Sequence, residues 1–175
     1  VSARHLFQDV WRLGLNWDDE LPIEMQKMFR TWLSGLQVLK EVSIPRRFFD
    51  TKWADCQGKV ELHAFGDASL RGYGACVYIV HRVSEKDVEC SLVRACARVA
   101  TMQRKTLPRL ELLGSLVTAQ LLKTVKESLH IKDDVTYYCW TDSMVALGWI
   151  NGMPSSWKPL FANRVATIQS LTNPS

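Results

Sequence analysis

Three acidic residues occupy positions where a carboxylate can do chemistry. Asp67 ends an apolar run that predicts a buried strand, Glu111 follows a Thr-Leu-Pro helix-start signal, and Asp142 ends a β-branched and aromatic run. A buried charge is costly unless something pairs with it or binds to it. Three close carboxylates need cations or protons between them, and an all-oxygen ligand set selects Mg²⁺ or Mn²⁺ rather than zinc. Two such ions about 3.5–4 Å apart activate a water and stabilise the leaving oxygen in phosphodiester cleavage.

Each acid also has an ordinary structural explanation. Asp67 can cap a turn through Ser69 or nearby backbone amides, and Asp142 can cap the helix that follows it. Glu111 can be a first-turn glutamate, stabilised by the positive end of the helix dipole. These explanations suffice for any one acid alone. Three acids at strand ends and a helix start favour a common site, because sites in α/β sheets gather there.

The elements that position these acids are predicted from a change of hydrophobic period. We expect strands over 60–67, 72–82 and 91–100, a helix from 106 to about 129, a strand over 135–141, and helices over 143–150 and 157–171. The short connections predict an antiparallel meander, and the crossover helix predicts a fourth strand parallel to an earlier one. The expected fold is α/β, with a mixed sheet in the order β-β-β-α-β-α-α.

If the first and fourth strands are neighbours, their acid-bearing ends adjoin. Alternation then puts His63, Phe65 and Asp67 on one face of the first strand. It puts Tyr138, Trp140 and Asp142 on one face of the fourth, and Glu111 can point between the two strands. Within the strand, His63 is expected to be a hydrogen-bonded interior or edge histidine.

Residues 1–47 form a separate helical segment in this interpretation. Asp18 or Asp19 can cap a helix with Pro22 in its first turn. The apolar stripe along this helix indicates packing; it comprises Met25, Met28, Phe29, Trp32, Leu36 and Leu39. A helix cannot continue through Pro45, so the expected domains are 1–47 and 60–175.

Composition narrows the class of protein. The chain has 175 residues, a net charge of +4 and a hydrophobic fraction of 47%, which suits a folded domain rather than a disordered chain. The absence of a signal peptide and of a membrane-length apolar run predicts no membrane partner. The five cysteines have no CxxC spacing, which argues against structural zinc and indicates reduced, buried thiols and an intracellular protein; they are Cys56, Cys76, Cys90, Cys96 and Cys139.

A stretch without acids between Glu89 and Glu111 contains five basic residues, Arg94, Arg98, Arg104, Lys105 and Arg109. Such a stretch can lie along a phosphate backbone. A solvated strand edge and loop is the simpler alternative.

Three motifs resemble the ribonuclease H domain of Bel/Pao-type LTR retrotransposon polyproteins. They are His63-Ala-Phe-Gly-Asp-Ala-Ser69, Leu107-Pro-Arg-Leu-Glu-Leu-Leu113 and Trp140-Thr-Asp-Ser-Met-Val-Ala-Leu147. Ala162-Asn-Arg-Val-Ala166 and Gln169 match the helix that follows in that family. The N-terminal helix with Ile44-Pro45-Arg46 resembles the connection between reverse transcriptase and ribonuclease H. The order and spacing of the motifs, over essentially the whole chain, are specific.

The resemblance implies cleavage of the RNA strand of an RNA–DNA hybrid with two divalent ions, Mg²⁺ or also Mn²⁺. Asp67 would bridge the ions, Glu111 would hold the ion nearer the leaving group, and Asp142 the ion nearer the nucleophile. The implied partners are the hybrid and the reverse transcriptase domain of the same polyprotein, in a cytoplasmic retrotransposon particle or in the nucleus. The residues expected to contact nucleic acid are Ser69, Arg94, Arg98, Arg104, Lys105 and Ser143.

Several alternatives stay open at this point. Helix capping is the ordinary explanation for Ser143, and core packing is the ordinary explanation for Trp149 and Trp157, which could instead lie under a sugar or base. The family has a further strand, a loop histidine and a fourth acid, which we expect to lie beyond Ser175, so the fragment is expected to be truncated and could be inactive. A non-catalytic module of the same fold would bind nucleic acid or support the polymerase. An integrase-type transferase fits less well, because its glutamate would lie in a late helix after both aspartates, whereas Glu111 lies between the two aspartates in sequence.

Overall fold

The computed structural model describes residues 2–49, 60–84, 87–103, 105–130 and 135–173. Two compact units divide the chain: Val1–Arg46 with Thr101–Gln103, and Arg47–Ala100 with Arg104–Ser175. The candidate acids all belong to the second, larger unit. No helix among the described residues is both long and apolar enough to cross a membrane.

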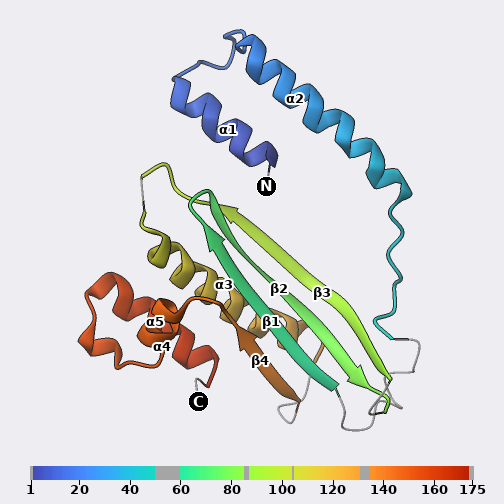
Figure 1. Ribbon diagram of the computed structural model, residues 1–175, viewed down its shortest axis with the longest axis vertical. Helices are drawn as coiled ribbons and strands as arrows, with labels where there is room; N and C mark the ends of the chain where they lie inside the picture. Colours follow the sequence, from blue (N-terminus) through green and yellow to red (C-terminus); the bar gives the residue numbers. More distant parts are fainter. Residues whose placement is uncertain (1, 50–59, 85–86, 104, 131–134, 174–175) are drawn as a thin grey trace. The chain divides into compact units, whose positions relative to one another are not determined.

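A four-stranded mixed sheet organises the larger unit (Figure 1). Its strands are β1 (Val60–Ser69), β2 (Gly72–Arg82), β3 (Val88–Val99) and β4 (Thr136–Trp140). The first three form the expected antiparallel meander, β4 pairs parallel to β1, and the spatial order is β3-β2-β1-β4. The α/β prediction is therefore confirmed. Among the described strands β4 lies at the sheet edge rather than at its centre, but it is the neighbour of β1, so their ends adjoin as expected.

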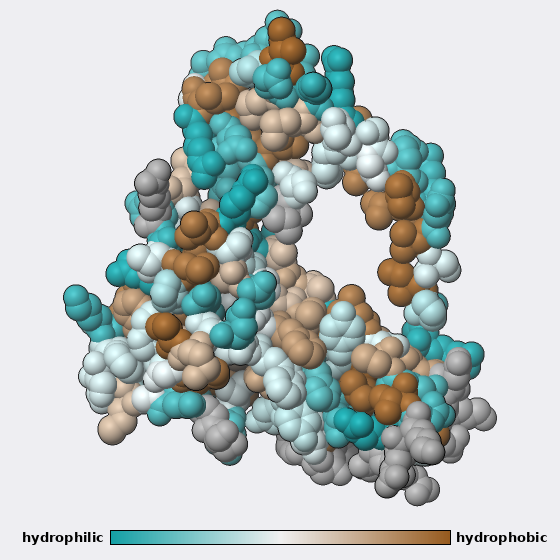
Figure 2. Space-filling view, viewed as in Figure 1, coloured by the Kyte–Doolittle hydropathy of each residue, from teal (hydrophilic) through white to brown (hydrophobic). Residues whose placement is uncertain are grey.

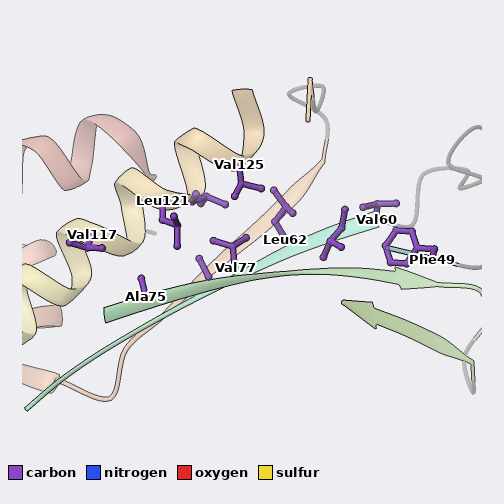
Figure 3. Packing of buried hydrophobic residues seen from close by; sticks show 11 residues of the cluster. Phe49, Val60, Leu62, Ala75, Val77, Val117, Leu121 and Val125 are labelled. Carbon is purple, nitrogen blue, oxygen red and sulfur yellow. The ribbon is translucent and has the colours of Figure 1, made fainter. Parts of the chain in front are cut away.

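Among the described residues, three α-helices and one short 3-10 helix complete this unit: α3 (Leu107–Ser128), α4 (Met144–Ile150), η3 (Pro154–Ser156) and α5 (Pro159–Leu171). Helix α3 packs on one face of β1 and β2 (Figure 1). Its Val117, Leu121 and Val125 point toward side chains of β1 and β2 in Figure 3. Burial of each such aliphatic side chain contributes roughly 1.5–3 kcal/mol, so this layer is the main source of stability. A second cluster joins α3 to α4 and α5 through Leu112, Ala119, Ile150, Val165 and Ile168.

The segment Phe48–Phe49 is part of the core of the larger unit. Phe49 is only 6% exposed and lies in the same cluster as Val60 and Leu62 (Figure 3). The Ser91 hydroxyl donates a hydrogen bond to the Phe48 carbonyl at 2.5 Å. This segment therefore closes the end of the sheet where β1 begins.

The smaller unit contains α1 (Ser2–Leu13), α2 (Ile23–Gly35) and the 3-10 helix η1 (Leu36–Glu41). The prediction of an Asp18 or Asp19 cap is wrong, because α2 begins after Pro22, and Asp19 instead accepts a hydrogen bond from the Asn16 amide at 2.7 Å. Of the residues in α2, only Met25 is buried. Large hydrophobic side chains are exposed in this unit, and brown hydrophobic side chains are visible at the surface in Figure 2. The expected apolar stripe is thus mostly open in this unit taken by itself.

Replacement of Phe49 by alanine tests whether the segment before β1 is a true part of the core. Phe49→Ala should lower the free energy of unfolding by about 3–5 kcal/mol, because it leaves a cavity in a packed cluster. Phe65→Ala is the matched control and should cost much less, since Phe65 is 42% exposed. Urea titrations monitored by tryptophan fluorescence would measure both, and equal losses would contradict the placement of Phe49.

Candidate active site

Helix α3 meets strand β1 at two glycines. A Cβ atom at Gly114 would lie 3.2 Å from the Asp67 carbonyl oxygen. A Cβ atom at Gly66 would lie 3.2 Å from the Gly114 carbonyl oxygen and would also collide with the Thr118 hydroxyl. That hydroxyl is held against α3 because it donates to the Gly114 carbonyl at 2.9 Å. A Cβ at Gly66 would require a shift of its neighbours and one at Gly114 would press on the Asp67 backbone, so glycine at both positions favours the close backbone contact that places α3 beside Asp67.

Asp67 is exposed, and the expectation of a buried charge at this position is wrong. Alternation along β1 turns Leu62 and Ala64 toward the core, whereas Asp67 points to the opposite side, where water solvates it. Its Oδ1 accepts a hydrogen bond from the Ala68 amide at 2.6 Å. Because the Asp67 carboxylate is exposed, it does not need a metal ion to compensate for a cost of burial.

Glu111 lies in the second turn of α3, because the helix begins at Leu107. The expectation of a first-turn glutamate is wrong, and the helix dipole acts mainly within the first turn. Thr106 occupies the expected N-cap position, but its hydroxyl makes no capping hydrogen bond. The half-buried Glu111 side chain instead receives a hydrogen bond at Oε2 from the Ser143 hydroxyl, at 2.5 Å.

Asp142 is exposed and follows the last residue of β4 by two positions. The N-cap of α4 is Ser143, whose hydroxyl oxygen accepts a hydrogen bond from the Ala146 amide at 3.1 Å. The helix-capping explanation therefore holds for Ser143 and fails for Asp142. This leaves the Asp142 carboxylate available at the end of the strand.

These contacts bring the three acids to one end of the sheet. The Asp67 backbone touches Gly114, Glu111 lies one turn earlier on the same helix, and its carboxylate touches the residue after Asp142. In the part of the chain that the structure describes, no three His, Cys, Asp or Glu side chains stand together as a ready metal-binding group. The donor set is nevertheless all carboxylate, which is the chemistry that Mg²⁺ and Mn²⁺ prefer. The residues therefore fit these ions by the chemistry of their carboxylates, and they lie at the same end of the sheet.

An aromatic cluster covers the sheet face that carries Asp67. His63 and Tyr138 stack with ring centroids 5.0 Å apart, and Phe65 and Trp140 with centroids 6.2 Å apart. The expected alternation is thus confirmed for His63, Phe65, Tyr138 and Trp140, whereas Asp142 lies beyond the end of β4. Both His63 nitrogens have partners, as expected, because Nδ1 accepts from the Trp140 indole at 3.2 Å and Nε2 lies 3.1 Å from Glu61.

Glu61 also binds Arg82 at 3.3 Å. Hydrogen bonds from Arg82 and then His63 hold the pKa of Glu61 below its usual value. This network fixes the orientation of the His63 ring at the middle of β1. It is one example of a local interaction that the sequence analysis did not anticipate.

The residues expected to contact nucleic acid do not form one cluster. Arg94 and Arg98 are exposed, and their pairing with Val77 and Tyr73 puts them on the α3 side of the sheet. Lys105 is half-buried, and Arg104 lies outside the described residues. The Ser69 hydroxyl serves the β1–β2 turn, where it donates to the Gly72 carbonyl at 3.3 Å.

The remaining candidates have structural roles. Trp149 and Trp157 pack against the cluster that joins α3 to α5, so the core explanation is confirmed. The described cysteines are unpaired, but none of them is buried, so the expectation of buried thiols is wrong for these four; Cys56 lies outside the described residues. The glycines at the α3–β1 contact escaped the sequence analysis, although a glycine inside a strand, such as Gly66, signals a close backbone approach.

A three-strand meander, a crossover helix and a fourth strand parallel to the first define an α/β domain of the ribonuclease H-like class. The sequence profile of the Pao retrotransposon-like RNaseH-like domain matches residues 1–143. The chain therefore belongs to this family, and the resemblance stated from its motifs is confirmed. No curated protein matches the sequence.

Three solved structures are similar at low sequence identity. The N-terminal RNase H domain of a Mycobacterium tuberculosis protein, fused to maltose-binding protein, is 14% identical with a TM-score of 0.39, over 65% of this chain and 73% of that chain. RNase H1 from Halobacterium salinarum NRC-1 is 14% identical with a TM-score of 0.33, over 66% and 77%. A foamy viral protease-reverse transcriptase in complex with RNA/DNA hybrid is 16% identical with a TM-score of 0.35; the match covers 83% of this chain and 22% of that one.

Substitution of Gly114 by alanine tests the α3–β1 contact. Gly114→Ala should destabilise the unit by about 1–3 kcal/mol, because the new methyl group presses on the Asp67 backbone and overpacks the contact. Gly148→Ala in α4 is the matched control, since a Cβ there meets nothing within 4 Å. It should stabilise the unit by roughly 0.5–1 kcal/mol, as alanine usually does in a helix. Thermal unfolding of both variants provides the comparison, and a stabilised Gly114→Ala protein would contradict the close contact.

Proposed function

We propose that the larger unit is a nuclease that cleaves the RNA strand of an RNA–DNA hybrid during reverse transcription. The observation that carries this proposal is the convergence of Asp67, Glu111 and Asp142 on one end of the sheet, in a chain of an RNaseH-like family. The activity belongs to the parent polyprotein in this proposal, and the 175-residue chain supplies three of its acidic groups.

The three acids would hold two Mg²⁺ ions, with Mn²⁺ as an alternative. Asp67, Glu111 and Asp142 would each supply carboxylate oxygens to hold these ions. Such ions, when bound, supply an activated water and stabilisation of the leaving oxygen. The exposed carboxylates of Asp67 and Asp142 are accessible to a large substrate, whereas Glu111 is held in place from the protein side by Ser143.

The hybrid would be recognised through its backbone. Hybrids are close to A-form in shape, and proteins read such helices through phosphates and 2′-hydroxyls rather than base edges. Exposed Arg94 and Arg98 share the α3-side face of β3, opposite the face that carries the Asp67 side chain. They can bind phosphates of a hybrid that extends past the acids, with Arg104 and Lys105 following in the chain. Ser69, the last residue of β1, could contact the same backbone only by giving up its hydrogen bond to the Gly72 carbonyl.

The reverse transcriptase domain of the same polyprotein is the proposed protein partner. Helices α1 and α2 would form the connection to it, since the family profile includes residues 1–46 and the apolar side chains of this unit are largely exposed. The proposed location is a cytoplasmic retrotransposon particle, or the nucleus.

A non-catalytic module is the second candidate function. It is favoured by one observation, that the described residues contain no ready-made group of three metal-binding side chains. In that case the unit would bind the hybrid or support the polymerase without cleaving RNA. A cleavage assay on a labelled hybrid, with this chain and with a longer piece of its reading frame, separates the two functions: cleavage supports the nuclease, and binding without cleavage by either protein supports the module.

Replacement of Asp67 by asparagine tests the assignment of the acids. Asp67→Asn should reduce Mg²⁺-dependent cleavage by more than roughly 100-fold. Loss of a residue that only hydrogen-bonds to a metal ligand costs up to about 100-fold, and loss of a ligand itself should cost more. Its stability should be unchanged or slightly higher without metal, because one of three neighbouring anions is removed. Asp87→Asn, an exposed aspartate in the β2–β3 turn, is the matched control. Near-normal cleavage by Asp67→Asn would refute the proposed site.

Replacement of Arg94 and Arg98 by alanine tests the hybrid-binding surface. Removal of each phosphate-binding side chain should reduce the slope of log K against log salt by about 1 and weaken binding to all hybrid sequences alike. Lys123→Ala removes one positive charge from the exposed side of α3 and should change binding little. Fluorescence anisotropy at several salt concentrations measures these slopes, and an unchanged slope in the double variant would place the hybrid elsewhere.

A further inference from the structure

The Ser143 hydroxyl makes two hydrogen bonds inside the protein. Its oxygen accepts from the Ala146 amide at 3.1 Å, and its proton goes to Glu111 Oε2 at 2.5 Å. The residue is only 6% exposed. A hydroxyl has one proton to donate, so in this arrangement Ser143 has no donor left for a nucleic acid backbone.

The two bonds join elements that are distant in sequence. Ser143 begins α4, at the end of the β4 connection, and Glu111 is 32 residues earlier on α3. Because the N-cap bond fixes the hydroxyl relative to α4, the second bond fixes the Glu111 carboxylate relative to Asp142, the residue just before Ser143. Oε1 of Glu111 is left to face another ligand.

We infer that Ser143 is a positioning residue for the candidate metal site, acting through Glu111 rather than on the substrate. This inference rests on the proposed function, because it assigns Glu111 to divalent ions. Partners that orient a ligand are worth 10–100-fold in metal affinity. Without the Ser143 bond, Glu111 can rotate among several side-chain conformations, and each binding event must restrict it again.

Glycine at position 143 separates this role from helix capping. Glycine is tolerated at an N-cap nearly as well as serine, whereas alanine is not. Ser143→Gly therefore removes the hydrogen bond to Glu111 while α4 keeps most of its capping stability. Ser143→Thr retains the hydroxyl and should rescue the site. Ser115→Ala is the matched control, because the Ser115 hydroxyl is also buried but bonds to the Glu111 backbone oxygen, at 3.1 Å, and not to its carboxylate.

The experiment is a Mn²⁺ titration of the 175-residue chain, in which the electron paramagnetic resonance signal of free Mn²⁺ measures binding. Ser143→Gly should weaken Mn²⁺ binding about 10-fold or more, while Ser143→Thr and Ser115→Ala stay close to the wild type. In a Glu111→Gln background, Ser143→Gly should have no further effect, because the two residues act as one unit. Wild-type affinity in the Ser143→Gly protein, or an equal loss in both backgrounds, would overturn the inference while leaving the proposed function intact.

A second measurement does not depend on metal. In an ion-free crystal structure of the Ser143→Gly protein, the Glu111 carboxylate should leave its orientation or occupy several conformations. An unchanged Glu111 side chain would overturn the inference. A wild-type chain that binds no Mn²⁺ would instead reject the assignment of these three acids to divalent ions, and the positioning role for metal with it.

Discussion

The backbones of helix α3 and strand β1 approach closely at Gly66 and Gly114, with the Thr118 hydroxyl packed against Gly66. This contact depends on the apolar layer farther along α3, where Val117, Leu121 and Val125 pack on β1 and β2. The layer presses the helix against the sheet, and the two glycines let it come close enough to reach Asp67. A larger side chain at either glycine would separate the two elements that carry the first two acids.

The rest of the candidate site is held together by polar contacts. Strand β4 runs parallel to β1, so its end reaches the same edge of the sheet as Asp67. The turn after β4 then places Ser143 within hydrogen-bond distance of Glu111. Exposed Asp67 and Asp142 and half-buried Glu111 are thus supported by different elements, each anchored by the common core. Exposed carboxylates such as those of Asp67 and Asp142 cost the fold little, because water solvates them.

Much of this arrangement could be predicted from the sequence. Hydrophobic period and turn residues located the four strands and three α-helices described in the larger unit, although β3 begins three residues earlier than expected and the 3-10 helix Pro154–Ser156 was not predicted. The crossover helix predicted the parallel pairing of β4. The exposure of each side chain was harder to predict, because it depends on which elements cover each face of the sheet. Asp67 was expected to be buried because its neighbours are apolar, yet alternation turns it toward solvent. Glu111 was expected in the first turn of α3, but the helix begins at Leu107, which puts Glu111 just past that turn. A pattern in the sequence does not fix a helix start to the single residue. The Ser143–Glu111 bond joins positions that no local pattern connects.

The central claim is that Asp67, Glu111 and Asp142 together bind divalent ions. The most direct test is a crystal of the chain soaked in Mn²⁺, with the ions located from their anomalous scattering. The account predicts Mn²⁺ peaks bounded by the carboxylates of these three residues, and no such peaks in crystals of the Asp142→Asn protein. Peaks located elsewhere, or a wild-type crystal with no peak at these carboxylates, would contradict it.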